Sequence, residues 1–214
     1  MHREWVGGLT RIFGGWPAGL VLTAVMLHGT SQGAEPQRYT VAPPPDWVQS
    51  APSESQSTAA WSQGASGGTE DLLSDLQIRV DESWSEYFHN ITRATNASGV
   101  SDISDIRIGF DPELDRLLIH SITLRRANET IDELQHGRIE VLQRESQLES
   151  GILDGSQTFH LVMSDVRVGD SIDFSYTIEH RDPVWGNRLY GRYLTHWSDP
   201  VRRSRIREIG RAHV

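Results

Sequence analysis

Apolar and polar residues alternate with a period of two over most of residues 70–207, and this pattern constrains the fold most strongly. Successive side chains of a strand point to opposite faces, so the alternation predicts strands with one apolar and one polar face. The clearest run covers residues 172–179, and Gly169-Asp170 just before it is typical of a tight turn. Its apolar residues are Ile172, Phe174, Tyr176 and Ile178.

Similar alternation recurs elsewhere and predicts several short strands. Its apolar sets are Leu76, Ile78 and Val80; Ile106, Ile108 and Phe110; Leu118, His120, Ile122 and Leu124; Ile139 and Val141; and Phe159, Leu161 and Met163. Residues 84–95 also read as extended, whereas residues 128–134 and 145–151 are expected to form short helical turns. The sequence therefore predicts a mainly β, antiparallel β-sandwich-like domain over residues 70–207 with minor short helices.

Residues 1–33 have the pattern of a signal peptide. Arg3 and Arg11 precede an apolar run over residues 12–27. Small residues follow this run, with a cleavage site expected near Gly33 or Ala34. The alternative is a retained membrane anchor, but the run is shorter than the roughly 20 residues that a span needs. We expect an exported protein of the periplasm or cell envelope, with an N-terminal membrane anchor as the alternative.

Residues 34–69 are expected to form a flexible linker rich in Pro, Ser and Gly. Three consecutive prolines, Pro43, Pro44 and Pro45, stiffen its start, and such a composition lacks the apolar residues that a packed core requires. Trp47 and Trp61 are the exceptions. They are interpreted as linker side chains, and docking of these two rings onto the following domain is the alternative.

The composition excludes several classes of chemistry. The chain has no cysteine, and all 20 of its basic residues are arginine, so disulfides, thiolate metal sites, a cysteine nucleophile and lysine Schiff bases are ruled out. The net charge of −9 argues against nucleic-acid binding. His180-Arg181-Asp182 and Asn187 match the spacing of a kinase catalytic loop, but a chain without lysine lacks the phosphate-binding residue of that site.

The remaining motifs predict no catalytic residue, cofactor or metal. Asp111, Glu113 and Asp115 alternate as in a calcium loop, but the required glycine and glutamate are absent, which favours an acidic turn. His120 and His160 are interpreted as half-buried, hydrogen-bonded strand residues, with a cross-strand zinc site as the alternative. A Ser-His-Asp triad stays open because these residue types are plentiful, but no Gly-x-Ser-x-Gly sequence marks a nucleophile.

The C-terminal region contains two further candidate features. Four arginines at positions 202, 203, 205 and 207 are interpreted as a connecting strand with a solvated basic edge. Exposed aromatic side chains would form a platform for a glycan or peptide, and inward packing of the same rings is the alternative. These candidate ligand-contact residues are Trp185, Tyr190, Tyr193 and Trp197.

Two segments resemble a known family. Residues 106–112 with the strand over 117–126, and residues 166–176 with their Gly-Asp-x-Ile-x-aromatic core, are similar to the bacterial domain of unknown function that precedes transglutaminase-like domains. Asn128-Glu129 departs from the family's usual Asp-Gly turn. The resemblance covers roughly residues 70–206, and it implies a β-sandwich-like domain of an exported envelope protein. A papain-like domain with a Cys-His-Asp triad usually follows it, and no triad position exists in this chain.

The resemblance leads to a hypothesis of function. Residues 208–214 look like the translation of a sequencing adapter, so the chain is expected to be a fragment whose native sequence stops near Arg207. The leading hypothesis is a non-catalytic β domain that supports the missing downstream domain or binds an envelope partner, with no nucleic acid involved. The alternatives are a free-standing periplasmic module that binds a glycan or peptide, and an enzyme in its own right.

Overall fold

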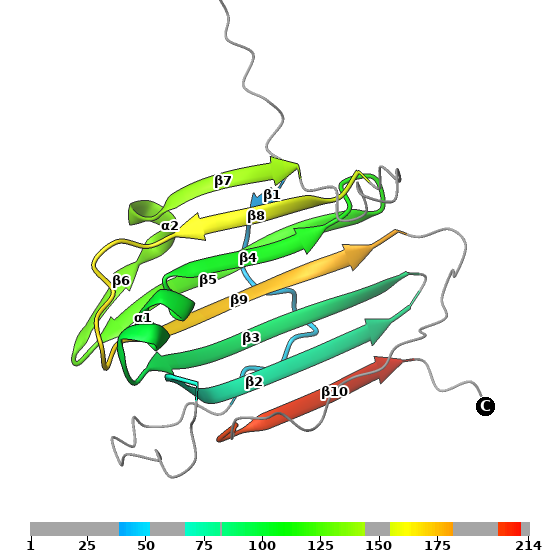
Figure 1. Ribbon diagram of the computed structural model, residues 1–214. Helices are drawn as coiled ribbons and strands as arrows, with labels where there is room; N and C mark the ends of the chain where they lie inside the picture. Colours follow the sequence, from blue (N-terminus) through cyan, green and yellow to red (C-terminus); the bar gives the residue numbers. More distant parts are fainter. Residues whose placement is uncertain (1–38, 52–66, 82, 144–154, 182–200, 211–214) are drawn as a thin grey trace, which may run out of the picture. The chain divides into compact units, whose positions relative to one another are not determined.

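The computed structural model describes residues 39–51, 67–81, 83–143, 155–181 and 201–210, all of which belong to one compact unit that begins at Pro36 (Figure 1). The strands are β1 (Tyr39–Val41), β2 (Thr69–Val80), β3 (Trp84–Ala94), β4 (Asp105–Phe110), β5 (Asp115–Arg126), β6 (Glu129–Asp132), β7 (Arg138–Gln143), β8 (Gln157–Val162), β9 (Ser171–His180) and β10 (Ser204–Gly210). The helices are α1 (Ala97–Ile103) and α2 (Glu133–His136). The mainly β prediction with short helices is confirmed.

Two sheets account for the described strands. The larger has seven strands in the order β1-β5-β9-β3-β2-β10, with β6 also paired to β5, and the smaller has the order β4-β8-β7. The long central strands are antiparallel, but β1 pairs with β5 and β10 pairs with β2 in parallel. The larger sheet is therefore mixed, and its two parallel pairs lie at its two edges.

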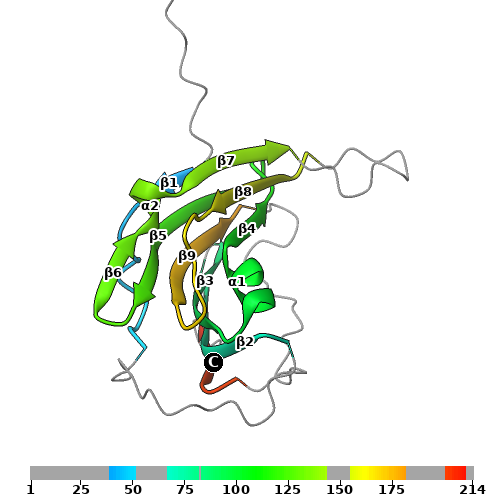
Figure 2. The ribbon, with the colours of Figure 1, turned by 60° about the vertical axis from the view of Figure 1, so that its left-hand side comes forward.

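The smaller sheet and α1 lie over one face of the larger sheet, which we call the inner face (Figures 1 and 2). The hydrophobic core lies between them, and Phe159 and Leu161 of β8 are fully buried there. The other buried core residues are Ala94, Ile103, Ile106, Ile108, Phe110, Leu117, Ile119, Ile122, Met163, Ile172 and Ile178. Burial of these side chains is the main favourable contribution to folding.

The alternation on β9 translates directly into its two faces. Ile172 and Ile178 enter the core, while Asp173, Ser175 and Thr177 point to the opposite side of the larger sheet, which we call the outer face. The prediction that Leu118 and Ile122 share a face of β5 is wrong. The pairing of β5 with β9 shifts register between Ile119 and Ser121. Such a bulge changes the face of every later residue, so Leu117, Ile119 and Ile122 enter the core instead.

The short helices differ from those expected. Residues 128–134 are not one helical turn, because Glu129–Asp132 pairs with β5 as β6 and only Glu133–His136 is helical. Cross-strand pairing here outweighs local helix propensity. The α1 helix was not expected, although Asn96 is a favourable N-cap and its side chain accepts a hydrogen bond from the Gly99 amide at 3.1 Å. The expected helix over 145–151 lies outside the described residues.

Glycine is required at position 99 of α1. A Cβ added there would lie 1.7 Å from the carbonyl oxygen of Gly68, so the backbone would have to move. We expect Gly99→Ala to lower the free energy of unfolding by about 1–3 kcal/mol. Chemical denaturation followed by circular dichroism measures this change. Gly109→Ala is the control, because its Cβ would have its nearest neighbour at 4.0 Å; equal losses in the two variants would contradict the steric explanation.

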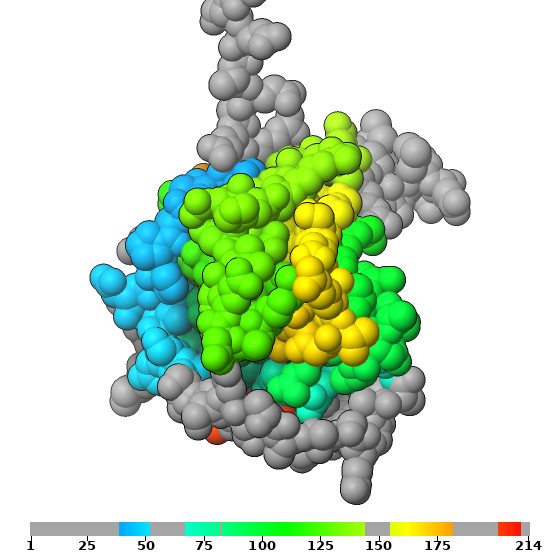
Figure 3. All heavy atoms as spheres, turned by 90° about the vertical axis from the view of Figure 1, so that its left-hand side faces the viewer, coloured from blue at the N-terminus to red at the C-terminus, as the bar shows by residue number. Residues whose placement is uncertain are grey.

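The first described segment differs from the predicted linker. Residues 42–51, which we call the strap, leave β1 and cross the outer face toward β2 and β10 (Figures 1 and 3). The sequence predicts a flexible linker over 34–69 because the segment lacks apolar residues. Its order comes instead from main-chain hydrogen bonds to the sheet, which hydropathy does not report.

Candidate functional site

The outer face carries a layer of polar side chains that strand pairing brings into rows. In one row Asp75, His89 and Ser175 are cross-strand neighbours, and in the next Gln77, Tyr87 and Thr177 are. Most of these residues are buried although they lie on the side away from the core. The outer-face polar layer consists of Asp75, Gln77, Tyr87, His89, His120, Asp173, Ser175 and Thr177. Buried polar groups are normally hydrogen-bonded, and a layer of them outside the core calls for an explanation. We therefore treat this layer as the main candidate site.

An ion pair joins the polar layer to the edge strand β10. The Asp75 carboxylate is 1% exposed and accepts hydrogen bonds from the Arg205 Nε at 2.6 Å and the Gln77 Nε2 at 3.0 Å. The Arg205 Nη2 also contacts this carboxylate, and the pairing raises the pKa of Arg205. The arginines of this region were expected to form a solvated edge. That expectation is wrong for Arg205, because the buried carboxylate draws its side chain onto the outer face.

A histidine–carboxylate pair lies next to this ion pair. The His89 Nε2 lies 2.8 Å from an Asp173 carboxylate oxygen, and the other oxygen of Asp173 binds Arg125. Ser175 is the cross-strand neighbour of His89, but its hydroxyl lies 2.9 Å from that of Ser121 and it also interacts with Tyr87. A nucleophile must hydrogen-bond its base to be activated. The described contacts of Ser175 therefore do not form a serine–histidine catalytic pair.

His120 is half-buried and hydrogen-bonded, as interpreted from the sequence. Its Nδ1 lies 2.8 Å from the carbonyl oxygen of Ala42, and its Nε2 lies 2.7 Å from the Thr177 hydroxyl. Burial lowers the pKa of His120, which favours the neutral ring. A neutral ring whose Nδ1 donates to the carbonyl accepts the Thr177 proton at Nε2, so this histidine joins the strap to the sheet.

A second cluster surrounds His180 at the end of β9. The His180 Nδ1 lies 2.8 Å from an Asp115 oxygen, its Nε2 lies 3.7 Å from Glu86, and its ring stacks on Trp84 with centroids 3.6 Å apart. Burial alone lowers the pKa of His180, but the two carboxylates outweigh burial and raise it to about 9. The imidazolium is thus the stable form at neutral pH. Of the kinase-like motif the structure describes His180 and Arg181, whereas Asp182 and Asn187 lie outside the described residues.

The His180 cluster predicts a pH dependence of stability. An ordinary histidine has a pKa of about 6.5, so a folded-state pKa of about 9 adds stability that is complete below about pH 6.5. This stability is lost as the pH rises through about 9. We expect the melting temperature to fall between pH 7 and 9.5, and His180→Gln to flatten this decline. The exposed His136→Gln is the control, and a decline unchanged in His180→Gln would contradict the assignment.

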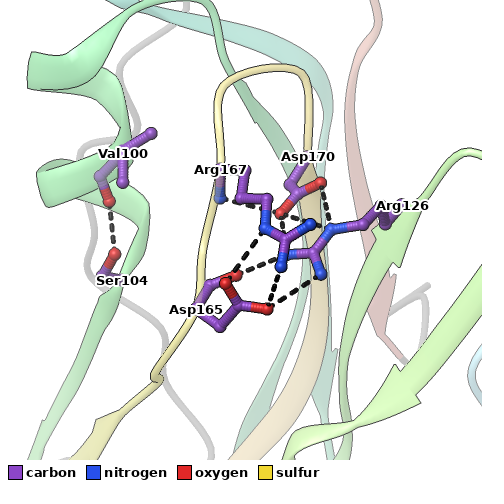
Figure 4. A network of polar contacts seen from close by, with 6 residues as sticks. All are labelled: Val100, Ser104, Arg126, Asp165, Arg167 and Asp170. Atoms are coloured by element: carbon purple, nitrogen blue, oxygen red, sulfur yellow. Dashed lines mark hydrogen bonds and ion pairs between the residues drawn. The ribbon is translucent and has the colours of Figure 1, made fainter.

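The Gly-Asp segment of the family resemblance forms a structural turn (Figure 4). Gly169 has φ 94°, a conformation that favours glycine, and the Asp170 carboxylate accepts the Arg167 amide at 2.8 Å. Arg126 of β5 donates to the same carboxylate at 2.7 Å from its Nη2 and binds Asp165 as well. These two carboxylates raise the pKa of Arg126. The segment therefore anchors the connection between β8 and β9.

The family of the chain follows from a model match that spans most of this fold. The model is described as a domain of unknown function with a solved structure, DUF3857, and it matches residues 80–207. The chain belongs to the DUF3857 family. The match runs from the last residue of β2 into β10, so it includes the Asp170 turn and the polar layer's residues on β3, β5 and β9. The resemblance to a domain of unknown function is thereby confirmed.

Other comparisons add little to the DUF3857 assignment. One similar solved structure is that of a protein described as a "putative protease" from Parabacteroides distasonis, with a TM-score of 0.48 and 14% identity. The similarity covers 53% of this chain and 23% of that protein, so the chain spans less than a quarter of its length. No curated protein matches the chain.

The residues predicted as a ligand platform are not placed by the structure. Trp185, Tyr190, Tyr193 and Trp197 all lie outside the described residues. Asp111 and Asp115 form the expected acidic turn, in which Asp115 accepts the Asp111 amide at 2.9 Å. Within the described ranges no three histidine and carboxylate residues are arranged to hold a metal ion. No helix in the described part of the DUF3857 chain has the length and hydropathy of a membrane span.

Sequence reasoning missed the outer-face polar layer. Its members alternate with the apolar residues of each strand and look like an ordinary solvated face. A weak signal was present, because Asp75, Gln77 and Arg79 and then Asp173, Ser175 and Thr177 form polar sets at alternating positions of two strand segments. The cover of that face comes from the proline-rich strap, which the sequence predicts as a flexible linker, with docking of Trp47 and Trp61 onto the domain as the alternative.

Proposed function

We propose that this DUF3857 chain is the non-catalytic N-terminal β domain of an exported bacterial transglutaminase-like protein, and that it supports the downstream domain or binds an envelope partner. The papain-like cysteine chemistry of the parent would reside in that downstream domain. The chain itself supplies no cysteine, and the described ionisable side chains of the polar layer bind one another across strands.

The firm attachment of the edge strand β10 to the sheet is the observation that carries this proposal. Its residues Ser204 to Arg207, which precede the expected end of the native sequence, pair with β2, and the partly buried Asp75–Arg205 ion pair fixes the Arg205 side chain to the sheet. A strand held in this way has little freedom to move relative to the sheet. A domain attached after β10 would therefore be held close to the sheet edge, which is the property that a supporting domain needs.

The gene sequence beyond codon 207 tests the proposal directly. We expect the native reading frame to continue into a second domain with a cysteine followed by a histidine and an aspartate. A natural stop codon near position 207 would reject the proposal. If the frame continues, replacing that cysteine by alanine should abolish the activity of the longer protein, while Ser175→Ala should leave it intact.

Export is tested separately. Cell fractionation with intact-mass measurement should find the protein in the periplasm or envelope, shortened by a cut near Gly33 or Ala34. A cytoplasmic, full-length product would contradict export, and a membrane-bound, full-length product would support the retained anchor.

A free-standing periplasmic binding module is the second candidate, and the strap on the outer face favours its peptide-binding form. A stop codon near position 207 together with binding to a peptide or to peptidoglycan would favour this candidate. If the aromatic platform binds the ligand, substitution of Trp185 or Trp197 should abolish that binding.

A further inference from the structure

The inner face carries a second apolar surface beside the hydrophobic core. Cross-strand pairing aligns four of its side chains in one row, which are Ile206 of β10, Leu76 of β2, Phe88 of β3 and Tyr176 of β9. The rings of Phe88 and Tyr176 are stacked with centroids 4.9 Å apart. Tyr176 packs against the core, whereas Ile206 at the other end of the row is 41% exposed. We call this row, together with Ile78, the inner-face apolar strip.

Among the described elements, none lies over the whole of this strip. The smaller sheet lies over β5 and β9, and α1 lies over β2 and β3 where β2 begins (Figures 1 and 2). Ile78 lies near the end of β2, and pairing through Glu86 puts it in the same inner-face row as Ile178. Ile78 is outside the core cluster and yet only 1% exposed. A strand side chain on an open sheet face keeps its tip in water, so the burial of Ile78 requires a cover.

The connection between β9 and β10 has to cross the sheet from one end to the other. β9 ends at His180 beside the start of β3, and the chain returns at Val201, which bridges Asp71 near the start of β2. Both β9 and β10 run parallel to β2, so these two points lie at opposite ends of the sheet. A crossover between parallel strands needs about a dozen residues or more. Residues 182–200 meet this requirement.

The handedness of parallel crossovers selects the face. Such connections within one sheet are right-handed in about 98% of cases, because strands twist in one direction. In the view of Figure 1 the inner face is toward the reader, and β9 and β10 both point to the right with β10 below β9. A connection from β9 to β10 that passes in front of the sheet is then right-handed. The outer face is also crossed by the strap, whose main chain binds Gln77 and Arg207.

The composition of residues 182–200 suits an apolar surface. Aromatic rings bury a large apolar area and pack favourably on other rings. The strip offers the stacked rings of Phe88 and Tyr176 and the aliphatic side chains of Leu76 and Ile206. The segment supplies four aromatic residues, which are Trp185, Tyr190, Tyr193 and Trp197.

We propose that residues 182–200 dock on the inner-face apolar strip as a right-handed crossover, and that their aromatic side chains pack inward there. The strip and the segment together form a second apolar core outside the smaller sheet. The rings that the sequence offers as a ligand platform then stabilise the fold, and they are not available to a glycan or peptide. This inference goes beyond the supporting role proposed above and needs no downstream domain.

Pairs of engineered cysteines test the position of the segment, because the chain has no cysteine of its own. One member is Thr195→Cys, and the second is Ile206→Cys or Arg207→Cys, which are neighbours on opposite faces of β10. We expect a short bis-maleimide reagent to link the Thr195→Cys and Ile206→Cys side chains, and not the Thr195→Cys and Arg207→Cys side chains. Mass spectrometry of the digested protein reads the links. Gly191→Cys with the same two partners gives a second position along the segment.

The matched pair also defines the results that would overturn the proposal. A link to Arg207→Cys alone would show that the segment crosses the outer face. Equal links to both partners, or no link from either position of the segment, would show that the segment does not dock on the strip.

Trypsin digestion tests docking in the chain without engineered cysteines. Because the chain has no lysine, the cleavage sites within residues 182–200 follow Arg188 and Arg192. We expect both cuts to be at least about tenfold slower than in a synthetic peptide of the segment, since cleavage follows the population of the undocked form. Ile206→Asp places a charge on the strip and should speed these cuts by about fivefold or more. Leu142→Asp is the control, because Leu142 is a similarly exposed strand residue of β7.

Equal cleavage rates in the chain and in the peptide, or equal effects of Ile206→Asp and Leu142→Asp, would contradict docking. Sedimentation velocity examines the other possible occupant. A wild-type dimer that Ile206→Asp dissociates would assign the strip to a second copy of the chain and overturn the proposal. Circular dichroism checks the folding of each variant, and Ile206→Ser replaces Ile206→Asp if the latter does not fold. None of these results depends on the gene sequence beyond codon 207.

Discussion

Asp75→Ala should lower the free energy of unfolding by about 3–5 kcal/mol, which is a large part of the stability of a typical domain. The Asp75 carboxylate is buried and accepts hydrogen bonds from both Arg205 and Gln77. Its removal leaves the Arg205 guanidinium without its counter-charge and the Gln77 amide without one acceptor. The Arg205 side chain is 25% exposed, so its charge is partly desolvated, and such a charge without its partner is unfavourable.

Urea denaturation monitored by circular dichroism measures this loss, and trypsin digestion locates it. Trypsin cuts this chain only after arginine, because the chain has no lysine. Release of β10 should therefore speed cleavage after Arg205 and Arg207. The control is Glu140→Ala, since the Arg138–Glu140 pair is exposed and contributes about 1 kcal/mol or less. An Asp75→Ala loss no larger than that of the control would contradict the structural role of the ion pair.

Phe159→Ala should also lower the free energy of unfolding by about 3–5 kcal/mol. Phe159 is fully buried on the central strand of the smaller sheet, and its ring meets Tyr39 edge-on with centroids 4.9 Å apart. The substitution removes apolar surface and leaves a cavity between the two sheets. Because Tyr39 belongs to β1, the loss should loosen the start of the strap as well as the core.

Thermal and urea denaturation measure the effect of Phe159→Ala, and hydrogen exchange of residues 39–42 reports the loosening of β1. Val162→Ala on the same strand is the control, because Val162 is 39% exposed and its truncation should change stability by about 0.5 kcal/mol or less. A Phe159→Ala loss below about 1 kcal/mol would show that the two sheets do not share one core.

Much of the strand pattern was predictable from local sequence. The period-two runs identified β2, β4, β7, β8 and β9, because burial of one strand face requires apolar residues at alternate positions. The β5 faces could not be predicted, since the register shift near Ile119 depends on pairing with β9. A bulge is a property of two strands and leaves little trace in either one.

The outer-face polar layer was less predictable from local sequence than the strand pattern was. The alternation of polar residues places Asp75 and Gln77 on one face of β2, and Asp173 and Thr177 on one face of β9. These two faces form one surface only because the strands have the order β2-β3-β9 in the sheet. Arg205 reaches Asp75 across 130 residues of chain, and Gln49 reaches Gln77 across 28. Pairing over such distances follows from strand order, which the residues at either end do not encode locally.

Local sequence was sufficient for the class of fold, for the faces of most strands and for the chemistry that a chain without cysteine or lysine lacks. These properties depend on composition and on a two-residue period, and both are local. Strand order, the β5 bulge, the docking of the strap and the pairing of Arg205 with Asp75 required the folded chain. Each depends on hydrogen bonds and ion pairs between segments far apart in sequence, and such contacts exist only after the sheet has assembled.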